Sequence, residues 1–465
     1  MTHRSVFLAI VAAIAGSIPL RAQQPARIDT AVVDSIIRHH VAEKRITGVS
    51  VGIMQHGAIV FARGYGTADL ETRRPVTAST MFAIGSVTKQ FTCSALLMLQ
   101  EEGKLSLSDP VSKYFPQLTR AADVTLLDLG GHVSGYRDYY PLDYVNREMA
   151  RAEPADTIIM RYATRPLDFD PRSRYSYSNT GYLILGRVVE RVSGQPFGAF
   201  LAARIFTPLH LTRTAYEPSP NGADMARGYT SFALAPPIAA EPEATGWAGA
   251  AGAIWSTPTD LLTWDRALLE HTLISPASVA TLTTPQRLTD GRSSGYGCGE
   301  AITDRGQAVR FSHGGAVSGF VAQNTILPGT QTALVILSNA DFSPIGELHQ
   351  ELLGKLVPSV DVPAVHGLSA LDAAKKFLSE LERGTVDRSS ISADFDAYLT
   401  PAKVAAAQRT LRGLGRIKDV RVAGLSERGG MEVATVRFTV GGTEALGLMY
   451  RTPDGKLEEF LFSRN

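Results

Sequence analysis

The sequence is poor in the residue patterns that build metal sites. Its 465 residues include two cysteines, Cys93 and Cys298, and no HExxH or CxxC pattern or His/Asp cluster at ligand spacing, which are the usual marks of a protein-bound metal ion. It also lacks an excess of either charge, because 46 lysines and arginines stand against 45 acidic residues and give a formal net charge of +1. We therefore expect no metal and no cofactor, and neither nucleic acid nor an anionic membrane surface as a partner.

The two cysteines lie far apart in the sequence. A bond between them would require an oxidising compartment. Cys93 lies within an almost wholly apolar stretch, where a cysteine behaves as a small buried hydrophobic residue. We therefore expect a buried thiol at Cys93 rather than a disulfide.

The first 22 residues have the pattern of a secretory signal. After a short basic start, residues 6–20 are largely apolar, and Leu20-Arg21-Ala22 resembles a cleavage site. The run is too short and too interrupted by Gly and Pro for a membrane span, so we favour a cleaved signal over an uncleaved anchor. Its loss removes Arg4 and Arg21 and changes the formal net charge from +1 to −1. We expect a periplasmic or secreted protein without a stable membrane span.

Residues 23–358 predict one large α+β domain. Strand-like patterns lie at both ends of this segment, and residues 104 to about 290 between them have the pattern of helices and loops. We expect an antiparallel sheet that joins the two ends, flanked by helices, beside an all-helical region. The expected elements at the ends are a helix at 29–45, a hairpin at 48–67 around His56-Gly57, strands within 295–302, 308–316, 320–328 and 332–339, and a helix at 343–357.

The pattern breaks at a linker, residues 359–367, which separates a second, smaller α+β domain at 368–465. Two helices precede four alternating runs, and the segment GLGRIKDVRVAGLSERGGMEVATVRFTV weakly resembles the cone-shaped nuclear-transport-factor-like superfamily. The resemblance implies a structural or pairing role, including a homodimer formed through this domain, and we find no catalytic set in it. The expected helices are 370–383 and 401–412, and the expected strands lie near 417–425, 431–439, 444–450 and 457–462.

A serine and a lysine stand three residues apart at the start of an apolar helix. The run from Phe91 to Leu99 is apolar on nearly every side, which is typical of a buried helix. Lys89 then lies in the first turn, against the positive end of the helix dipole. In one interpretation Ser86 caps the helix and Lys89 extends to solvent. In the other they are a nucleophile and its base, which requires about 4 kcal/mol to lower a lysine pKa from about 10.4 to about 7.

Two later clusters fit the second interpretation. Tyr177-Ser178-Asn179 immediately precedes an amphipathic helix, so a tyrosine able to relay a proton and an amide able to hold a carbonyl lie at its start. The alternatives are that Tyr177 packs and Asn179 caps, or that Tyr144-Val145-Asn146 is the relevant pattern. His313-Gly314-Gly315 lies in a strand-like segment, where glycine lets the backbone approach a ligand closely. The alternative there is a surface turn.

In this order and spacing the three motifs resemble those of the serine β-lactamase and penicillin-binding protein superfamily, especially its class C-related branch of esterases and D-peptidases. The stretches LLDLGGHVSGYRDY and GAAGAIWSTPTDLLTWDRALL also look familial, and the resemblance spans roughly residues 30 to 345. It implies a β-lactamase/transpeptidase-like fold.

The resemblance implies a role for each motif residue. Ser86 would be the acylated nucleophile, and Lys89 and Tyr177 would share its proton. The backbone amides of Ser86 and Ala316 would form the oxyanion hole, where one donor is worth about 2.7–4 kcal/mol. The substrate would be bound by Asn179, His313 and Gly315.

The third motif departs from the family. Many β-lactamases have Lys-Thr-Gly where this chain has His313-Gly314-Gly315, and a histidine is mostly neutral near pH 7 but gains charge toward pH 6. We therefore expect an exported serine hydrolase of ester or amide bonds, a carboxylesterase or D-amino-acid peptidase, with a small-molecule ester, amide or peptide as substrate. The alternatives are a penicillin-recognising DD-carboxypeptidase or weak β-lactamase, and a non-catalytic cell-wall binding protein. The acyl donor and the oligomeric state stay open.

Overall fold

The computed structural model describes residues 27–44, 46–140, 145–219, 222–231, 235–303, 309–357 and 363–464. The chain forms two compact units, Met1–Val357 and Pro358–Asn465, which are described one at a time. The predicted signal at 1–22 and residues 359–362 of the predicted linker lie outside the described residues. The predicted domain limits therefore stay a prediction.

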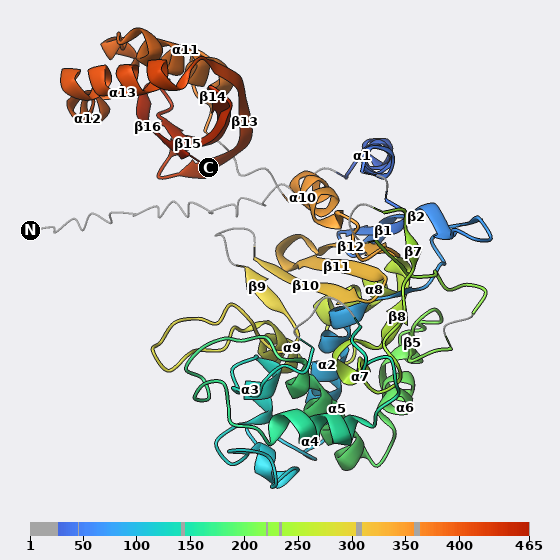
Figure 1. Ribbon diagram of the computed structural model, residues 1–465. Helices are drawn as coiled ribbons and strands as arrows, with labels where there is room; N and C mark the ends of the chain where they lie inside the picture. The colour runs from blue at the N-terminus through green and yellow to red at the C-terminus, as the bar shows by residue number, and fades with distance from the viewer. Residues whose placement is uncertain are drawn as a thin grey trace, which may run out of the picture. The chain divides into compact units, whose positions relative to one another are not determined.

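An antiparallel sheet of seven strands forms the centre of the first unit, in the order β3-β2-β1-β12-β11-β10-β9 (Figure 1). Strand β1 pairs with β12, so that Val51 lies opposite Ile336. The predicted sheet, which joins the two ends of the segment, is confirmed. Its strands are β1 (Gly48–Gln55), β2 (Ala58–Asp69), β3 (Arg74–Pro75), β9 (Ala301–Thr303), β10 (Arg310–Val317), β11 (Phe320–Leu327) and β12 (Thr332–Ser338).

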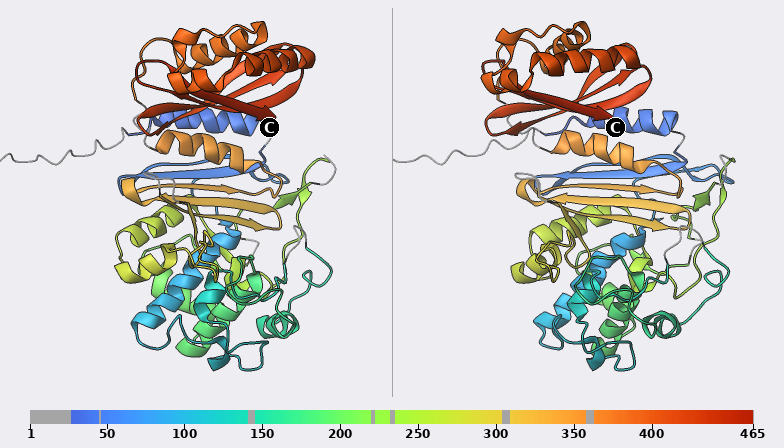
Figure 2. Two further views of the ribbon diagram at one scale, coloured as in Figure 1. Left: turned by 90° about the vertical axis from the view of Figure 1, so that its left-hand side faces the viewer. Right: turned by 60° about the vertical axis from the view of Figure 1, so that its left-hand side comes forward.

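Helices cover both faces of this sheet (Figure 2). On one face α1 (Thr30–Glu43) and α10 (Ile345–Leu356) bury Ile37 and Leu352 against β1 and β12. On the other face α8 (Pro258–Leu269) packs so closely on β1 that a Cβ at Gly52 would lie 2.8 Å from Pro258 Cβ. Because both faces are covered, all residues of β1 and β12 are buried, and apolar burial of this kind stabilises the sheet by about 25 cal/mol per Å².

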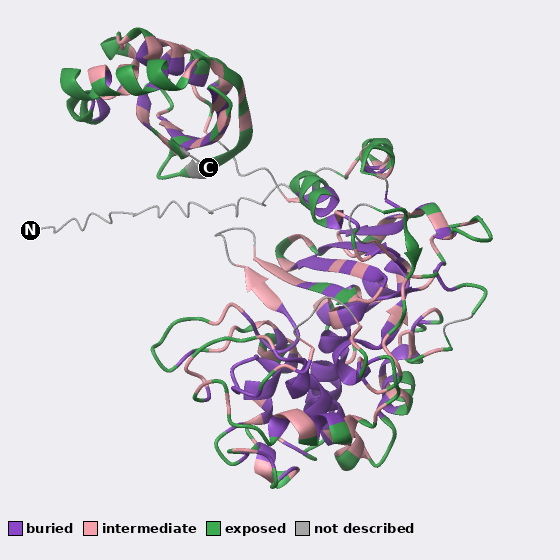
Figure 3. Ribbon diagram, viewed as in Figure 1, coloured by how far each residue is buried: buried purple, intermediate pink, exposed green. Residues whose placement is uncertain are grey.

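The region below the sheet is helical around α2 (Thr88–Glu101), of which the first twelve residues are buried (Figure 3). The chain between β3 and β9 also contains short strands, which the sequence did not predict. The further helices are α3 (Leu126–Gly130), α4 (Ala155–Ala163), α5 (Asn179–Ser193), α6 (Phe197–Leu201), α7 (Gly249–Gly252) and α9 (Pro276–Thr283), with a π-helical turn η3 (Ala202–Phe206), 3₁₀ turns η1 (Gly85–Val87), η2 (Val111–Lys113) and η4 (Pro328–Thr330), and strands β4 (Phe82–Ala83), β5 (Ala215–Tyr216), β6 (Tyr229–Thr230), β7 (Ile238–Ala239) and β8 (Ile254–Ser256).

Two local predictions are wrong. Ser86 does not cap α2, because it lies in the 3₁₀ turn η1 and the N-cap is Val87, without a side-chain hydrogen bond. The predicted strand at 295–302 is a turn for most of its length, and β9 begins at Ala301. Gly295 and Gly299 have φ values of 73° and 85° there, which an extended strand does not allow.

The second unit has a four-stranded antiparallel sheet that curves around its helices (Figure 1). Phe377 and Phe460 lie in its core, and a buried ion pair joins Arg451 and Glu432. The predicted helices and strands are confirmed, and one further helix, α12, was missed; the likeness to nuclear-transport-factor-like cones stays a prediction. The elements are α11 (Ala370–Arg383), η5 (Arg388–Ser390), α12 (Ala393–Tyr398), α13 (Pro401–Leu414), β13 (Ile417–Arg428), β14 (Met431–Val440), β15 (Thr443–Arg451) and β16 (Leu457–Arg464).

Candidate active site

Lys89 is fully buried at the start of α2. Its Nζ lies 2.9 Å from Ser86 Oγ, 2.8 Å from Asn179 Oδ1 and 2.8 Å from the carbonyl oxygen of Ala251 in α7. The interpretation in which Lys89 extends to solvent is therefore wrong. Three segments distant in the sequence converge on one amine.

The three partners of the Lys89 amine determine where its lone pair points. The Asn179 Oδ1 and Ala251 carbonyl oxygens can only accept, so a neutral amine directs both of its N–H groups to them. Ser86 Oγ is the one partner that can donate, and it then faces the lone pair. Burial lowers the pKa of Lys89 from its usual 10.5 to about 7, against the opposing effect of the Asp138 carboxylate. At neutral pH a large fraction of Lys89 is therefore a free base directed at a serine hydroxyl.

Tyr177 lies beside the same pair. Its ring centroid is 4.8 Å from Lys89 Nζ. Burial raises the pKa of Tyr177 well above its usual 10, and a hydrogen bond with the Ser86 side chain opposes that shift. Tyr177 is consequently a protonated phenol at neutral pH, able to donate or relay a proton, while Lys89 is the stronger candidate for the base. Tyr144 of the competing pattern lies outside the described residues.

Asn179 is the first residue of α5, whose N-cap is Ser178, so the capping interpretation of Asn179 is wrong. The Asp138 carboxylate orients it, because it accepts a hydrogen bond from the Asn179 backbone amide at 2.9 Å and from the Asn179 Nδ2 at 3.3 Å. This contact directs Asn179 Oδ1 toward Lys89. Burial raises the pKa of Asp138, opposed by these hydrogen bonds and by Lys89.

The turn η1 and strand β10 meet without side chains between them. A Cβ at Gly315 would lie 2.0 Å from the Ile84 carbonyl oxygen, and a Cβ at Gly85, which has φ +52°, would lie 2.7 Å from the Ala316 nitrogen. Only glycine fits both positions. This contact places the Ala316 backbone amide next to the turn that carries Ser86, as the expected oxyanion hole requires.

His313 lies at the same site, with its ring centroid 6.2 Å from that of Tyr177, and it is buried. The surface-turn interpretation is therefore wrong. Its Nδ1 is 2.6 Å from the Gly314 carbonyl oxygen, which can only accept, so Nδ1 carries the proton. Burial and the nearby Lys89 lower the pKa of His313 from 6.5 to about 3. The expectation that His313 gains charge toward pH 6 is wrong.

His132 is a residue of the site to which the sequence assigned no role. It is buried with φ +59°, and its ring centroid lies 4.1 Å from that of Tyr177. Its Nδ1 accepts a hydrogen bond from the Ser178 amide at 3.1 Å. His132 therefore supports both the ring and the backbone of the Tyr177 loop. The familial stretch LLDLGGHVSGYRDY contained this residue, but its contact depends on tertiary structure.

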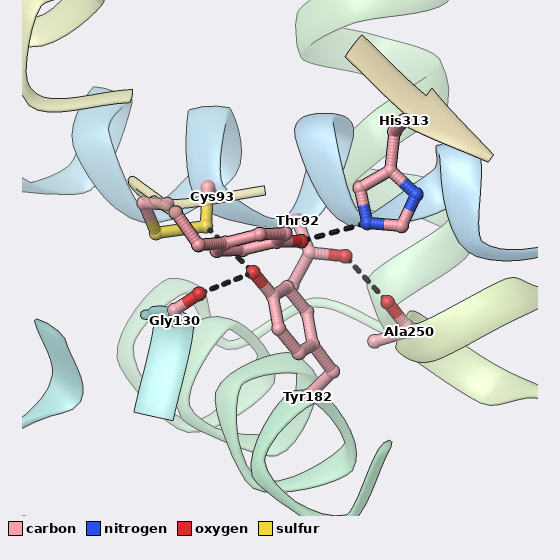
Figure 4. The surroundings of a disulfide bond; sticks show 8 residues. Thr92, Cys93, Gly130, Tyr182, Ala250 and His313 are labelled. Carbon is pink, nitrogen blue, oxygen red and sulfur yellow. Dashed lines mark hydrogen bonds between the residues drawn. A yellow bond between two sulfur atoms is a disulfide. The ribbon is translucent and has the colours of Figure 1, made fainter. Parts of the chain in front are cut away.

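Cys93 and Cys298 form a disulfide (Figure 4), so the prediction of a buried thiol is wrong. Cys93 lies one turn after Lys89 on α2, and Cys298 lies in the turn before β9. The bond crosses the core beside Tyr182, whose hydroxyl donates to the Gly130 carbonyl oxygen at 2.7 Å. Residue 298 was expected in a strand, and the turn found there brings it to α2.

The described part of the chain contains no group of three or more His, Cys, Asp or Glu residues that could hold a metal ion. Within the same residues, no helix is both long and apolar enough to cross a membrane.

The model of the family described as Beta-lactamase matches residues 33–355. The chain belongs to this family. Among its relatives is a D-aminopeptidase of Gluconobacter oxydans (strain 621H), 28% identical over 299 residues, which are 63% of this chain and 55% of the relative. A penicillin-binding protein of Bacillus subtilis (strain 168) is 27% identical over 316 residues, 65% of this chain and 70% of the relative. The chain thus spans little more than half the length of the D-aminopeptidase.

A solved structure of an octameric penicillin-binding protein homologue from Pyrococcus abyssi shares the fold over most of the chain. It has a TM-score of 0.64 at 21% identity and covers 94% of this chain and 96% of its own. The family match confirms the predicted superfamily, and this likeness confirms its β-lactamase/transpeptidase-like fold.

Proposed function

We propose that this chain is a serine hydrolase that cleaves an amide or ester bond through an acyl-enzyme on Ser86. The observation that carries the proposal is the buried Lys89 amine, 2.9 Å from Ser86 Oγ, whose two other partners are acceptors only. A buried lysine with a pKa near 7 has no evident structural use, whereas such an amine is suited to act as a general base at neutral pH. A non-catalytic binding protein would not need it.

In the proposed first step, the Ser86 hydroxyl proton passes to Lys89 as Oγ bonds to the substrate carbonyl carbon. The carbonyl π electrons move to its oxygen, and the backbone amides of Ser86 and Ala316 donate to that oxyanion. The tetrahedral intermediate then expels the amine or alcohol, which takes the Tyr177 proton, and the Lys89 ammonium reprotonates Tyr177. In the second half, water bonds to the carbonyl carbon of the Ser86 ester as Lys89 takes one of its protons. The C–Oγ bond then breaks, Lys89 returns the proton to Ser86 Oγ, and the acid is released.

For the substrate we propose an amide or small peptide of a D-amino acid with a free ammonium group. A buried neutral His313 cannot anchor the carboxylate of a β-lactam as a fixed cation does. The polar groups that flank the site are acidic instead. Asp138 contacts Asn179, and Glu243 accepts from the amide of Ser318, two residues beyond Ala316. The similarity to a D-aminopeptidase supports this choice.

A substrate panel tests the proposal. We expect D-amino-acid amides and p-nitrophenyl esters to be hydrolysed, nitrocefin to be hydrolysed slowly or not at all, and L-amino-acid amides to be poor substrates. A fluorophosphonate should label the wild type, and Ser86→Ala should abolish both labelling and turnover without changing the fold. Labelling without any turnover would support the binding-protein alternative. Efficient nitrocefin hydrolysis would support the penicillin-recognising alternative, toward which the Bacillus subtilis relative points.

We also propose that the protein is exported by a signal at residues 1–22 and acts in the periplasm or outside the cell. The disulfide between Cys93 and Cys298 supports this proposal, because such bonds persist in oxidising compartments. N-terminal sequencing of the mature protein tests it, with a start at Gln23 expected. Pairing of two chains through residues 368–465 remains a proposal that the solution mass of the full chain would test.

A further inference from the structure

A cavity of about 650 Å³ lies in the helical region, between α5, α6, α7 and β5. This volume suits a small organic ligand. Its lining includes the aromatic residues Phe197 and Tyr216, and its charged residues, Arg187 among them, come from different elements. Figure 1 shows the elements that surround it. The residues that the argument uses are Glu153, Leu183, Glu190, Phe197, Ala199 and Glu217.

Glu217 is a solvent-exposed carboxylate of the cavity lining, and among the described residues it has no ion pair, unlike its two acidic neighbours. Glu153 is paired with Arg161 at 2.9 Å, and Glu190 is paired with Arg187. Among the described residues, the Glu217 carboxylate accepts one hydrogen bond, from the Gly246 amide at 3.3 Å, and has no ion pair. Glu217 is exposed to solvent over much of its surface, but partial burial of its carboxylate and nearby Glu190 raise its pKa. A cation in the cavity would relieve both effects.

Glu217 also has an unusual backbone. Its φ is +44°, a left-handed conformation that non-glycine residues adopt infrequently. Its backbone amide donates a hydrogen bond, 3.0 Å long, to the carbonyl oxygen of Ala253, which is the first residue after α7. A strained residue is kept in place only when the surroundings determine it, and here they hold a carboxylate at the cavity wall.

The same cavity touches the segment that positions the catalytic lysine. Gly249 and Ala250 of α7 line it, and the next residue, Ala251, supplies the carbonyl oxygen that accepts from Lys89. The Ala250 carbonyl oxygen accepts from Thr92 Oγ1 at 2.7 Å, also on α2. On the cavity side, a Cβ at Gly186 would lie 2.4 Å from Ala250 Cβ, so α7 is closely packed and a ligand against it bears on these contacts.

We propose that this cavity is a second binding site, which takes a small primary amine with an apolar body and whose occupancy alters turnover at Ser86 through α7. The ammonium group pairs with Glu217, and the apolar body packs against Phe197 and Leu183. The site is distinct from that of Ser86, because the cavity lining contains none of the catalytic-site residues Ser86, Lys89, Tyr177, Asn179 and His313.

Calorimetric titration of the full chain with 2-phenylethylamine at pH 7.5 tests binding. We expect saturable binding of the amine. Neutral 2-phenylethanol and anionic 3-phenylpropanoate should bind with at least tenfold lower affinity. Glu217→Gln should weaken amine binding at least tenfold. Glu153 lines the same cavity but is already paired with Arg161, so Glu153→Gln should change the affinity less than threefold. Ala199→Phe, on the exposed side of α6, should fill the cavity and abolish binding without altering charge.

Several results would overturn the binding proposal. They are no binding to the wild type, equal affinity for the amine and the alcohol, or amine binding that neither Glu217→Gln nor Ala199→Phe weakens. Thermal unfolding of each variant controls for folding, and if Glu217→Gln fails to fold then Ala199→Phe decides. None of these measurements requires turnover, so they stand even if the proposed hydrolase function fails.

Turnover of a p-nitrophenyl ester tests the coupling to Ser86. Saturating amine should change kcat in the wild type and in Glu153→Gln but not in Glu217→Gln. A rise in KM alone would place the amine in the catalytic site and overturn the proposal. Binding without any change in kcat would show that α7 does not transmit occupancy.

Discussion

The Tyr296 hydroxyl donates a hydrogen bond to Nε2 of His313 at 2.7 Å. Because Nδ1 is occupied by the Gly314 carbonyl oxygen, the imidazole is fixed in one neutral tautomer. Tyr296 stands two residues before Cys298, which the disulfide attaches to α2. The helix that carries Lys89 and the strand that carries His313 are therefore connected through a short covalently anchored turn.

Tyr177→Phe should lower kcat by about 10²- to 10⁴-fold, because the ring is kept and the relay hydroxyl is lost. Tyr175→Phe is a matched control, since this neighbouring tyrosine contacts the ring of His132 from a more exposed position. Steady-state kinetics on the best ester compares the two variants. Equal losses in both would assign the effect to packing, and Tyr144→Phe tests the other Tyr-x-Asn pattern in the same assay.

The rate should fall as the pH drops below about 7, because protonation of Lys89 removes the base. Asp138 raises the Lys89 pKa, so Asp138→Asn should move the acid limb of kcat/KM to lower pH. The control is Asp290→Asn, because Asp290 is an exposed acid paired with Arg292. This variant should leave the acid limb of kcat/KM at the wild-type pH. A limb that stays fixed in Asp138→Asn would argue against Lys89 as its source.

His313 should make the free energy of unfolding depend on pH. The unfolded imidazole takes up a proton near pH 6.5, whereas folded His313 stays neutral down to about pH 3. The unfolded state then binds more protons, so wild type should lose about 1.4 kcal/mol per pH unit below pH 6.5 relative to His313→Gln. Urea unfolding at several pH values measures this difference, and parallel curves for the two proteins would contradict it. KM for anionic substrates should accordingly not improve between pH 8 and 5.5.

Loss of the disulfide should destabilise the protein by about 2–5 kcal/mol, because it closes a long loop with a sequence separation of 205. Cys93→Ala/Cys298→Ala and reduced wild type should show similar losses in urea unfolding, and kcat should fall with them because the turn of Tyr296 is released. Reductant should have no effect on the double variant. Unchanged stability of the wild type in reductant would show that the bond contributes little.

Much of the fold could be predicted because its signals are local. The alternation at 48–67 predicted β1 and β2, and the apolar run after Lys89 predicted a buried α2, both without reference to distant residues. Gly295 to Gly299 indicated a turn, but the sequence did not show that this turn replaces most of the strand expected at 295–302.

The residues of the candidate site also fall into two groups, those that sequence motifs identify and those that only the folded chain brings together. Ser86, Lys89, Tyr177 and Asn179 stand in motifs that the sequence displays, and the structure brings them together. His132 and Tyr296 contribute through ring contacts that only the packed core creates. The Ala251 carbonyl could not be identified in advance, since any backbone oxygen carries the same chemistry and only position selects it.

The sheet order has a consequence for biosynthesis. Strand β1 lies between β2 and β12, so one of its edges has no partner until the ribosome has released residue 338. During that interval eight residues that end up fully buried are held only by a hairpin, which is marginally stable alone in water. A nascent chain or a fragment that ends before β12 therefore presents an open apolar edge, which favours aggregation.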